Sequence, residues 1–334
     1  MKNKIFLFEC LVGLALMASS TALVCGDDFQ QACEDAAKSI PSESITYKGQ
    51  EGWMYSGSEL RHLAAGRFFT SSPKDPQADP IPSIVDFNDQ LKKLGVKLIL
   101  VPVPPKATVY PEGLSSKFTP AIAYAVLHEF YGILKDKGVE ILDLHGVFVE
   151  TKKPGHDLYC RQDSHWSPYA CTIAAKAIAS IIKPEPWVQN VPKKQFMIEN
   201  KEIELTGDLW ESLGDKSIPK EKVLSVLVTS METIDTSSPV LVIGDSHTLV
   251  FHAGEDMLAE KSGLVDHLAY ELGFPVDLLA VRGSGATSVR INLYRKAKQP
   301  GWLKRIKVIV WCISAREFTE ASGGWRKVPV ESGK

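Results

Sequence analysis

The sequence predicts an α/β fold in which helices cover a doubly wound, mostly parallel β-sheet. The first observation is a set of short, continuous apolar runs, such as residues 97–103 and 239–243, which are typical of strands buried on both faces. The second is that segments with helical spacing of apolar residues separate several of these runs. The third is that no internal repeat, low-complexity tract or convincing linker interrupts residues 27–334, which favours a single domain.

The composition is that of a folded globular protein. The 334 residues are 44% hydrophobic and 23% charged, which excludes wholesale disorder and allows a large core. Lys and Arg number 38 against 40 Asp and Glu, a formal net charge of −2. This balance gives no electrostatic case for binding nucleic acid or an anionic membrane surface. The function must therefore be sought in local sites.

Residues 1–26 have the pattern of a secretory signal peptide. Lys2 and Lys4 precede an apolar stretch at residues 5–24 that only Glu9 interrupts. Val24-Cys25-Gly26 is an acceptable cleavage site, and Ala18-Ser19-Ser20 is a rival. The stretch is also close to the roughly 20 residues that span a bilayer, so an uncleaved N-terminal anchor is the alternative. In both cases we expect the protein to be exported.

Four cysteines follow this segment: Cys33, Cys160, Cys171 and Cys312. In an oxidising compartment they permit one or two disulfides, with three connectivities if all four pair. None belongs to a C-x-x-C pair, so zinc ribbons and thioredoxin-like redox chemistry find no support. Cys312 lies in a strongly apolar strand pattern and is expected to be a free buried thiol.

The first half of the chain supplies two helix–strand units. Ser83 is predicted to cap a helix that Gly95 ends, before the strand at residues 97–103. Thr119-Pro120 opens a second helix that Gly138 ends, and residues 139–144 are the next predicted strand.

The second half continues the alternation. Ser167-Pro168 starts a third helix that carries apolar residues along one face. Residues 183–222 are Pro-rich and irregular, and we expect them to form an insertion that leaves the core. Further strands are predicted at residues 223–228, 239–243, 276–281 and 307–313.

Ser246 is the candidate nucleophile. The buried strand at residues 239–243 leads directly into Gly244-Asp245-Ser246, and ligands of open α/β sheets bind beyond the carboxyl ends of the strands. Gly244 relieves crowding at the turn, and backbone N–H groups that start the next helix can face an oxyanion. The pattern is not the G-x-S-x-G elbow, because Thr248 replaces the second glycine. The alternative is that Ser246 only caps a helix.

Asp163 and His165 supply the base and the group that orients it. In an extended segment, residues two positions apart project to the same side, so both can stand together ahead of the helix capped by Ser167. The alternative is a polar loop whose Asp and His hydrogen-bond locally. Ser164 is a rival nucleophile, but it should point away from both residues and follows no buried strand.

A glycine-rich turn, Arg282-Gly283-Ser284-Gly285, follows the strand at residues 276–281. Gly283 lets the backbone approach an oxyanion closely; otherwise it is a loop glycine. Together with Gly244-Asp245-Ser246, this turn resembles the SGNH, or GDSL-like, hydrolase superfamily. Two departures are visible. The Asp-x-His element precedes the serine, and Ser314-Ala315-Arg316-Glu317 stands where the usual oxyanion-hole asparagine is expected.

This rearranged order resembles the AlgX/AlgJ family of alginate O-acetyltransferases, over about residues 47–318. The motifs that carry the resemblance are Gly49-Gln-Glu-Gly-Trp-Met-Tyr55, Glu59-Leu-Arg-His-Leu63, Pro102-Val-Pro-Pro-Lys106, Asp163-Ser-His-Trp166 and Gly244-Asp-Ser246. The family's triad maps onto Asp163, His165 and Ser246. The sequence lacks the appended carbohydrate-binding module of the AlgX branch, so we expect a single-domain member.

The resemblance implies transfer of an acetyl group through an acetyl-serine to a sugar hydroxyl of an exopolysaccharide such as alginate. It implies a periplasmic location and a membrane-bound acyltransferase partner that supplies the acetyl group. We expect no cofactor and no metal. Trp166 could stack on a sugar or simply pack at the helix start. Lys106, Arg282 and Arg316 each follow a strand and could meet an anionic substrate or be ordinary surface charges.

Three other functions remain open from the sequence. A secreted carbohydrate acetyl-esterase would share the whole triad. A non-catalytic polysaccharide-binding relative would explain the missing asparagine. A metal site built from Asp163, His165, His247 and His252 has no supporting helix spacing.

Overall fold

The computed structural model describes residues 26–71 and 73–331. In this part of the chain the centre is a four-stranded parallel sheet with the order β3-β8-β6-β7. Its strands are β3 (Lys97–Val103), β6 (Val240–Gly244), β7 (Asp277–Ala280) and β8 (Val308–Ser314). Each lies where the sequence predicts a strand, to within one residue at either end.

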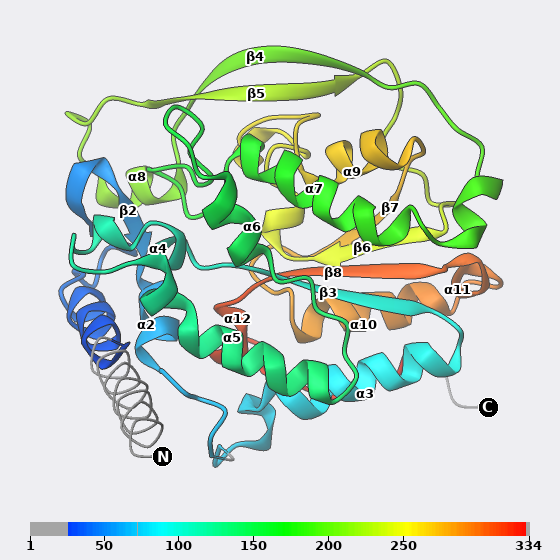
Figure 1. The fold of residues 1–334 in the computed structure, drawn as a ribbon, viewed down its shortest axis with the longest axis horizontal. Helices are drawn as coiled ribbons and strands as arrows, with labels where there is room; N and C mark the ends of the chain where they lie inside the picture. Colours follow the sequence, from blue (N-terminus) through cyan, green and yellow to red (C-terminus); the bar gives the residue numbers. More distant parts are fainter. Residues whose placement is uncertain (1–25, 72, 332–334) are drawn as a thin grey trace, which may run out of the picture.

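Helices cover both faces of this sheet (Figure 1). In that view α7 (Pro168–Ile182) and α9 (Leu264–Leu272) lie above the sheet. Three others, α3 (Pro80–Lys93), α5 (Pro120–Asp136) and α10 (Thr287–Ala297), lie below it. The predicted doubly wound α/β class is confirmed. The reason is physical: β6 and β8 are buried along their whole length, as continuous apolar strands of a covered parallel sheet must be.

Two local predictions in the first half are wrong. The helix expected from Ser83 begins earlier, at Pro80, because Asp79 accepts a 3.0 Å hydrogen bond from the N–H of Ile81 and caps it. Ser83 instead donates to the Trp325 carbonyl. The strand expected at residues 139–144 is a single bridge between Ile141 and Leu100, because α6 (Leu144–Thr151) begins there.

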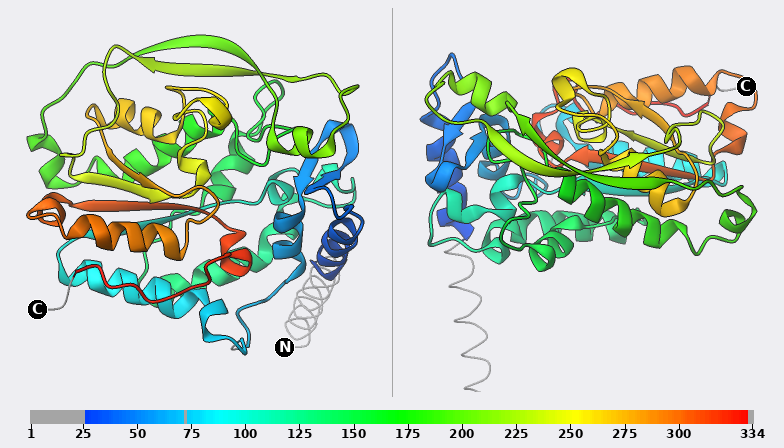
Figure 2. Two further views of the ribbon diagram at one scale, coloured as in Figure 1. Left: turned by 180° about the vertical axis from the view of Figure 1, so that it is seen from behind. Right: turned by 90° about the horizontal axis from the view of Figure 1, so that it is seen from above.

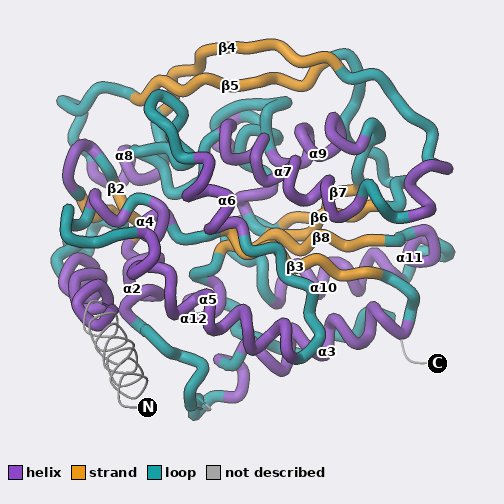
Figure 3. Tube along the Cα trace, viewed as in Figure 1, coloured by secondary structure: helices purple, strands orange, loops and turns teal. Residues whose placement is uncertain are grey.

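The insertion at residues 183–222 is not irregular. It contains η4 (Pro186–Asn190), β4 (Met197–Leu205) and α8 (Asp208–Leu213). β4 pairs antiparallel with β5 (Glu221–Thr229), so the strand predicted at residues 223–228 belongs to this separate ribbon and not to the central sheet. Figure 3 shows the ribbon above the α7 and α9 layer. β4 is exposed along most of its length, so the buried-strand pattern that guided the sequence prediction is absent.

The N-terminal part of the described chain packs against the end of this insertion. Residues 26–38 are helical, and β1 (Thr46–Lys48) pairs antiparallel with β2 (Met54–Ser56) ahead of α2 (Gly57–Ala64). Met54 forms a small apolar cluster with Leu209 and Trp210 of α8. Figure 2 shows these segments together at one end of the sheet in both views. This end carries the candidate site.

The remaining elements are single turns. They are α4 (Lys106–Val109), α11 (Trp302–Arg305), α12 (Glu317–Glu320), η1 (Gln50–Gly52), η2 (Pro76–Ala78), η3 (Pro111–Gly113), η5 (Ser246–Thr248) and η6 (Glu255–Met257).

All four cysteines of the described chain are buried and unpaired. The disulfides that their even number permitted are therefore not formed, whereas the prediction of a free buried thiol at Cys312 is confirmed. Burial raises the pKa of each of these thiols. The predicted signal or anchor falls on residues 1–26 and so lies almost wholly outside the described residues. Among the described helices none is both long enough and apolar enough to span a membrane.

Candidate active site

Ser246 lies at the carboxyl edge of the sheet, as the first residue of η5 after β6. Gly244 makes this approach possible, because a Cβ there would lie 2.0 Å from the Cys312 carbonyl oxygen of β8. The Asp245 carboxylate then fixes the turn. One oxygen accepts a 2.9 Å hydrogen bond from the N–H of His247, and the other a 2.7 Å bond from that of Ser314. The ends of β6 and β8 are thereby tied together directly beneath Ser246.

Asp163 and His165 come from the loop before α7. The Asp163 carboxylate accepts a 2.8 Å hydrogen bond from the backbone N–H of His165, so a tight side-chain-to-backbone turn, and not an extended segment, brings the two together. The Glu221 carboxylate of β5 accepts from the N–H groups of Arg161 and Gln162 at 2.9 and 3.0 Å. Two flanking elements thus hold the loop, β5 on one side and α7 on the other.

The three predicted residues form a continuous hydrogen-bonded chain. His165 Nδ1 lies 2.7 Å from Asp163 Oδ1, and His165 Nε2 lies 2.7 Å from Ser246 Oγ. All three side chains are buried, with Ser246 only 6% exposed. This is the geometry of a nucleophile, a base and the group that orients the base. Ser164, the rival nucleophile, donates to Asp208 instead.

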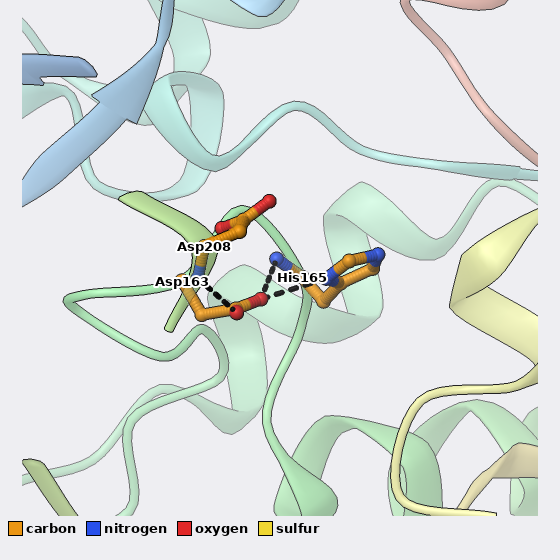
Figure 4. A group of neighbouring side chains, drawn as sticks. All are labelled: Asp163, His165 and Asp208. Atoms are coloured by element: carbon orange, nitrogen blue, oxygen red, sulfur yellow. Dashed lines mark hydrogen bonds and ion pairs between the residues drawn. The ribbon is translucent and has the colours of Figure 1, made fainter. Parts of the chain in front are cut away.

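Asp208, the first residue of α8, was not predicted from the sequence. Its backbone N–H donates a 2.9 Å hydrogen bond to Asp163 Oδ2, the oxygen that His165 leaves free. Its own carboxylate accepts from the N–H and hydroxyl of Ser164 at 2.7 and 2.5 Å. Figure 4 shows the Asp163 carboxylate between Asp208 and His165, with the bonds that both residues make to it drawn as dashed lines.

Asp163, His165 and Asp208 also offer ligand atoms that lie within 4.8 Å of one another. Both carboxylate oxygens of Asp163 and the Nδ1 atom of His165 already take part in hydrogen bonds. A metal ion at this place would have to displace those bonds. The four-residue metal cluster considered from the sequence does not assemble, because His252 pairs with Asp266 at 2.9 Å.

Charges in the centre follow from these contacts. Burial alone would raise the pKa of Asp163, but the imidazole of His165 and backbone N–H donors hold it well below the ordinary value. Burial lowers and the Asp163 carboxylate raises the pKa of His165, and the net shift is upward. The pair is therefore poised to hold a proton on His165 next to an ionised Asp163.

Lys106 is neither a substrate contact nor a surface charge, so both sequence interpretations of it are wrong. It is 1% exposed, and its ammonium donates to the backbone carbonyls of Met54 and Asp163 at 2.8 and 2.5 Å. Burial lowers its pKa, which the nearby Glu59 carboxylate partly offsets. Lys106 therefore fastens β2 to the backbone of the Asp163 loop.

Trp166 packs and does not face a sugar. Its side chain is fully buried, and its indole N–H donates 3.1 Å to the carbonyl of His247. The packing alternative thus fits, and stacking on a substrate does not. The bond links the loop that carries His165 to the turn that carries Ser246.

A cleft of about 1030 Å³ opens over Ser246 and His165. The predicted Gly283, Arg282 and Arg316 all line it. Gly283 has φ +67°, a conformation that favours glycine. Arg282 forms an ion pair with Asp256, and Arg316 is half-buried with a 3.4 Å contact to the Ser58 hydroxyl.

Glu317 is a second residue that the sequence reasoning missed. It lines the cleft, is 3% exposed and leaves its Oε2 without a hydrogen-bond partner. Burial and the nearby Asp245 carboxylate raise its pKa to about 8. A glutamate after an apolar strand gives no sequence signal of this environment, since burial depends on the packing of α12.

Fold and site together define an SGNH hydrolase-like protein, with the serine after a central strand and an Asp–His pair beside it. Residues 47–315 match the family described as "SGNH hydrolase-like domain, acetyltransferase AlgX", and the chain belongs to this family. The resemblance predicted from the motifs is thereby confirmed.

Relatives and solved structures agree with this assignment. The chain is 27% identical over 246 residues to a probable alginate O-acetylase AlgJ of Pseudomonas fluorescens, covering 71% of this chain and 59% of that protein. The O-acetyltransferase domain of Pseudomonas putida AlgJ shares the fold with a TM-score of 0.62 and 20% identity, over 83% of this chain and 93% of that one. Pseudomonas aeruginosa AlgX shares the fold with a TM-score of 0.60 and 17% identity, over 82% of this chain and 64% of that one. The chain spans about half the length of the curated AlgJ proteins that it matches.

Proposed function

We propose that this protein is a polysaccharide O-acetyltransferase in which Ser246, His165 and Asp163 act as a catalytic triad. The observation that carries the proposal is the pair of 2.7 Å contacts that joins the three side chains beneath an open cleft. Family membership supports acetyl transfer as the chemistry, because the relatives bear the name alginate O-acetylase.

In the first step His165 Nε2 takes the hydroxyl proton of Ser246, and the freed Oγ attacks the carbonyl carbon of an acetyl donor. The resulting tetrahedral intermediate collapses: the bond from carbon to the donor's leaving atom breaks, and His165 returns the proton to that atom. Acetyl-Ser246 remains. Asp163 holds the imidazole in the tautomer with its proton on Nδ1 and stabilises the imidazolium during the step.

In the second step His165 takes the proton of a sugar hydroxyl, whose oxygen attacks the acetyl-serine. The ester bond to Ser246 Oγ breaks, Oγ regains the proton from His165, and the acetylated sugar leaves. The backbone N–H groups of Ser246 and Gly283 are our candidates for holding the oxyanion in both steps. Such a donor contributes about 3–4 kcal/mol to transition-state stability.

We place this reaction in the periplasm, with a membrane-bound acyltransferase as the source of acetyl groups. The secretory pattern of residues 1–26 and the family resemblance support this placement. The triad serves a hydrolase equally well, so the difference between transferase and esterase lies in whether sugar or water attacks acetyl-Ser246.

Intact mass after reaction with 4-nitrophenyl acetate or a sulfonyl fluoride tests the proposal. The wild-type chain should gain one acetyl or sulfonyl group, and Ser246→Ala should gain none, while Ser164→Ala should react like the wild type. An adduct that persists in Ser246→Ala would refute the assignment. Adding an oligosaccharide then separates the two activities, because an esterase releases only free acetate.

A further inference from the structure

The walls of the cleft over Ser246 carry more acidic than basic side chains. Apart from Asp163 and the largely protonated Glu317, the carboxylates lie on four separate elements around the opening. They are Glu204 at the end of β4, Asp208 and Glu211 of α8, Glu255 and Asp256 of η6, and Glu320 of α12. Apart from His165, the basic side chains that line the same cleft are Arg61, Arg282 and Arg316.

Ion pairs inside the cleft neutralise the charges of two of these arginines. Arg61 lies 2.9 Å from the carboxylate of Glu320, and Arg282 pairs with Asp256. Within residues 26–71 and 73–331, no salt bridge involves the other four carboxylates. Glu204, Glu211 and Glu255 are exposed, and within this part of the chain the hydrogen bonds of the Asp208 carboxylate come only from Ser164, as described above. Arg316 is the one lining cation of the described chain that has no carboxylate partner within an ion-pair distance.

Of the three sequence candidates for meeting an anionic substrate, only Arg316 is therefore free of an ion pair among the described residues and lines the cleft. Lys106 is buried behind the Asp163 loop, and Arg282 is occupied by Asp256. Exposed carboxylates are ionised at neutral pH, and charges of one sign along a cleft repel ligands of the same sign. A polyuronate such as alginate carries one carboxylate on every sugar, so it would bring like charge against Glu204, Glu211 and Glu255.

We propose that the cleft binds an acceptor glycan without carboxylates, and that free amines on the acceptor strengthen binding. This inference rests on the proposed acetyl transfer and names its acceptor class. Carboxylates accept hydrogen bonds from sugar hydroxyls and pair with ammonium groups. Each exposed pair changes affinity by a factor of up to about five. Several such pairs give an expected preference of about tenfold for an amino-sugar oligomer over a uronate oligomer at low salt.

Affinity measurements with three oligosaccharides of equal length test this. The probes are a glucosamine oligomer, its fully N-acetylated form and a mannuronate oligomer, each bound to the wild-type chain without an acetyl donor at low and high salt. Binding should fall in that order, and salt should narrow the differences. Uronate binding as tight as that of the N-acetylated form, or no gain from free amines, would overturn the proposal.

Paired variants locate the effect. The double variant Glu204→Gln with Glu211→Gln should reduce the preference for the glucosamine oligomer over its N-acetylated form. It should also increase the affinity for the mannuronate oligomer several-fold. Glu199→Gln with Glu232→Gln removes two exposed carboxylates outside the cleft and should change neither. Equal behaviour of the two double variants would contradict a role of the cleft. Acetylation of Ser246 by 4-nitrophenyl acetate, measured on the same protein, reports the proposed function independently, so the two proposals fail separately.

Discussion

The backbone N–H of Asp208 donates a 2.9 Å hydrogen bond to the carboxylate of Asp163, although 45 positions separate the two residues. The bond satisfies the oxygen that His165 does not use, and it helps to keep the Asp163 pKa low. The first turn of α8, an element of the insertion, is therefore part of the site's electrostatics.

The pair Asp163–His165 predicts the pH dependence of acetyl-enzyme formation. The base must be neutral to take the serine proton, and the Asp163 carboxylate raises the His165 pKa above the ordinary value of 6.5. Activity should therefore fall as the pH drops, with a midpoint above 6.5. Asp163→Asn should lower both this midpoint and kcat, the latter by about 10³–10⁴-fold, because the imidazole loses its charge partner and its tautomer.

The measurement is kcat/KM for 4-nitrophenyl acetate across pH 5 to 9, which reports groups of the free enzyme. An acid midpoint that stays in place in Asp163→Asn would contradict the assignment of the limb to His165.

Lys106 should act as a positioning residue. Lys106→Met leaves the carbonyls of Met54 and Asp163 without their donor in a buried place, which costs about 1–3 kcal/mol of unfolding free energy. Because the Asp163 loop loosens, kcat should fall more than KM rises. Lys220→Met removes an exposed lysine and should stay within about 0.5 kcal/mol of the wild type. Denaturant unfolding and steady-state kinetics provide both readouts, and unchanged kcat in a folded Lys106→Met would refute this role.

Gly207 is required by the close approach of α8 to the Asp163 loop. A Cβ at this position would lie 2.2 Å from the Gln162 carbonyl oxygen and 2.5 Å from the Asp163 Cβ. Gly207→Ala should push the loop away and lower kcat by up to about 100-fold, since small displacements of reacting groups are that costly. Gly146→Ala is the matched control, because a Cβ there meets nothing within 4 Å. It should leave kcat unchanged and stabilise α6 by about 0.5–1 kcal/mol. Similar kinetics in both variants would show that the contact does not matter.

The raised pKa of Glu317 predicts that the free energy of unfolding depends on pH. Its pKa is about 8 in the folded protein against an ordinary 4.5, so the folded state binds more protons between these values. The stability that its protonated form contributes is present below about pH 4.5 and is lost as pH rises towards 8, at about 1.4 kcal/mol for each pH unit. Glu317→Gln has no proton to lose. Relative to this variant, the wild type should weaken from pH 5 to 8 in denaturant unfolding, and a constant difference between them would refute the assignment.

Much of the sheet and of the triad was predictable, because residues close together in the sequence indicate both. The apolar runs of β3, β6 and β8 have no stable place except between two helix layers. Asp163 and His165 stand two positions apart, and Ser246 lies two positions after the end of a buried strand. These signals require no knowledge of distant contacts.

The supporting residues were not predictable, because their roles depend on packing between remote segments. Asp208 lies in a Pro-rich stretch whose pairing of β4 with β5 has no apolar alternation to reveal it. From the sequence alone, Lys106 is expected to be a surface charge. Only the structure shows that its ammonium donates to the Met54 and Asp163 carbonyls. Trp166 next to the base is compatible with either packing or sugar binding until its indole is seen to meet His247.

The four cysteines of the described residues are buried and form no disulfide, which has a practical consequence for labelling experiments. Thiols that are shielded from solvent react slowly with alkylating dyes, and folding of residues 26–331 needs no oxidant. A fluorophore attached through Ser58→Cys at the cleft wall would then report from that wall with little background labelling from this part of the chain. Its fluorescence would follow the binding of an oligosaccharide in real time, in the absence of an acetyl donor.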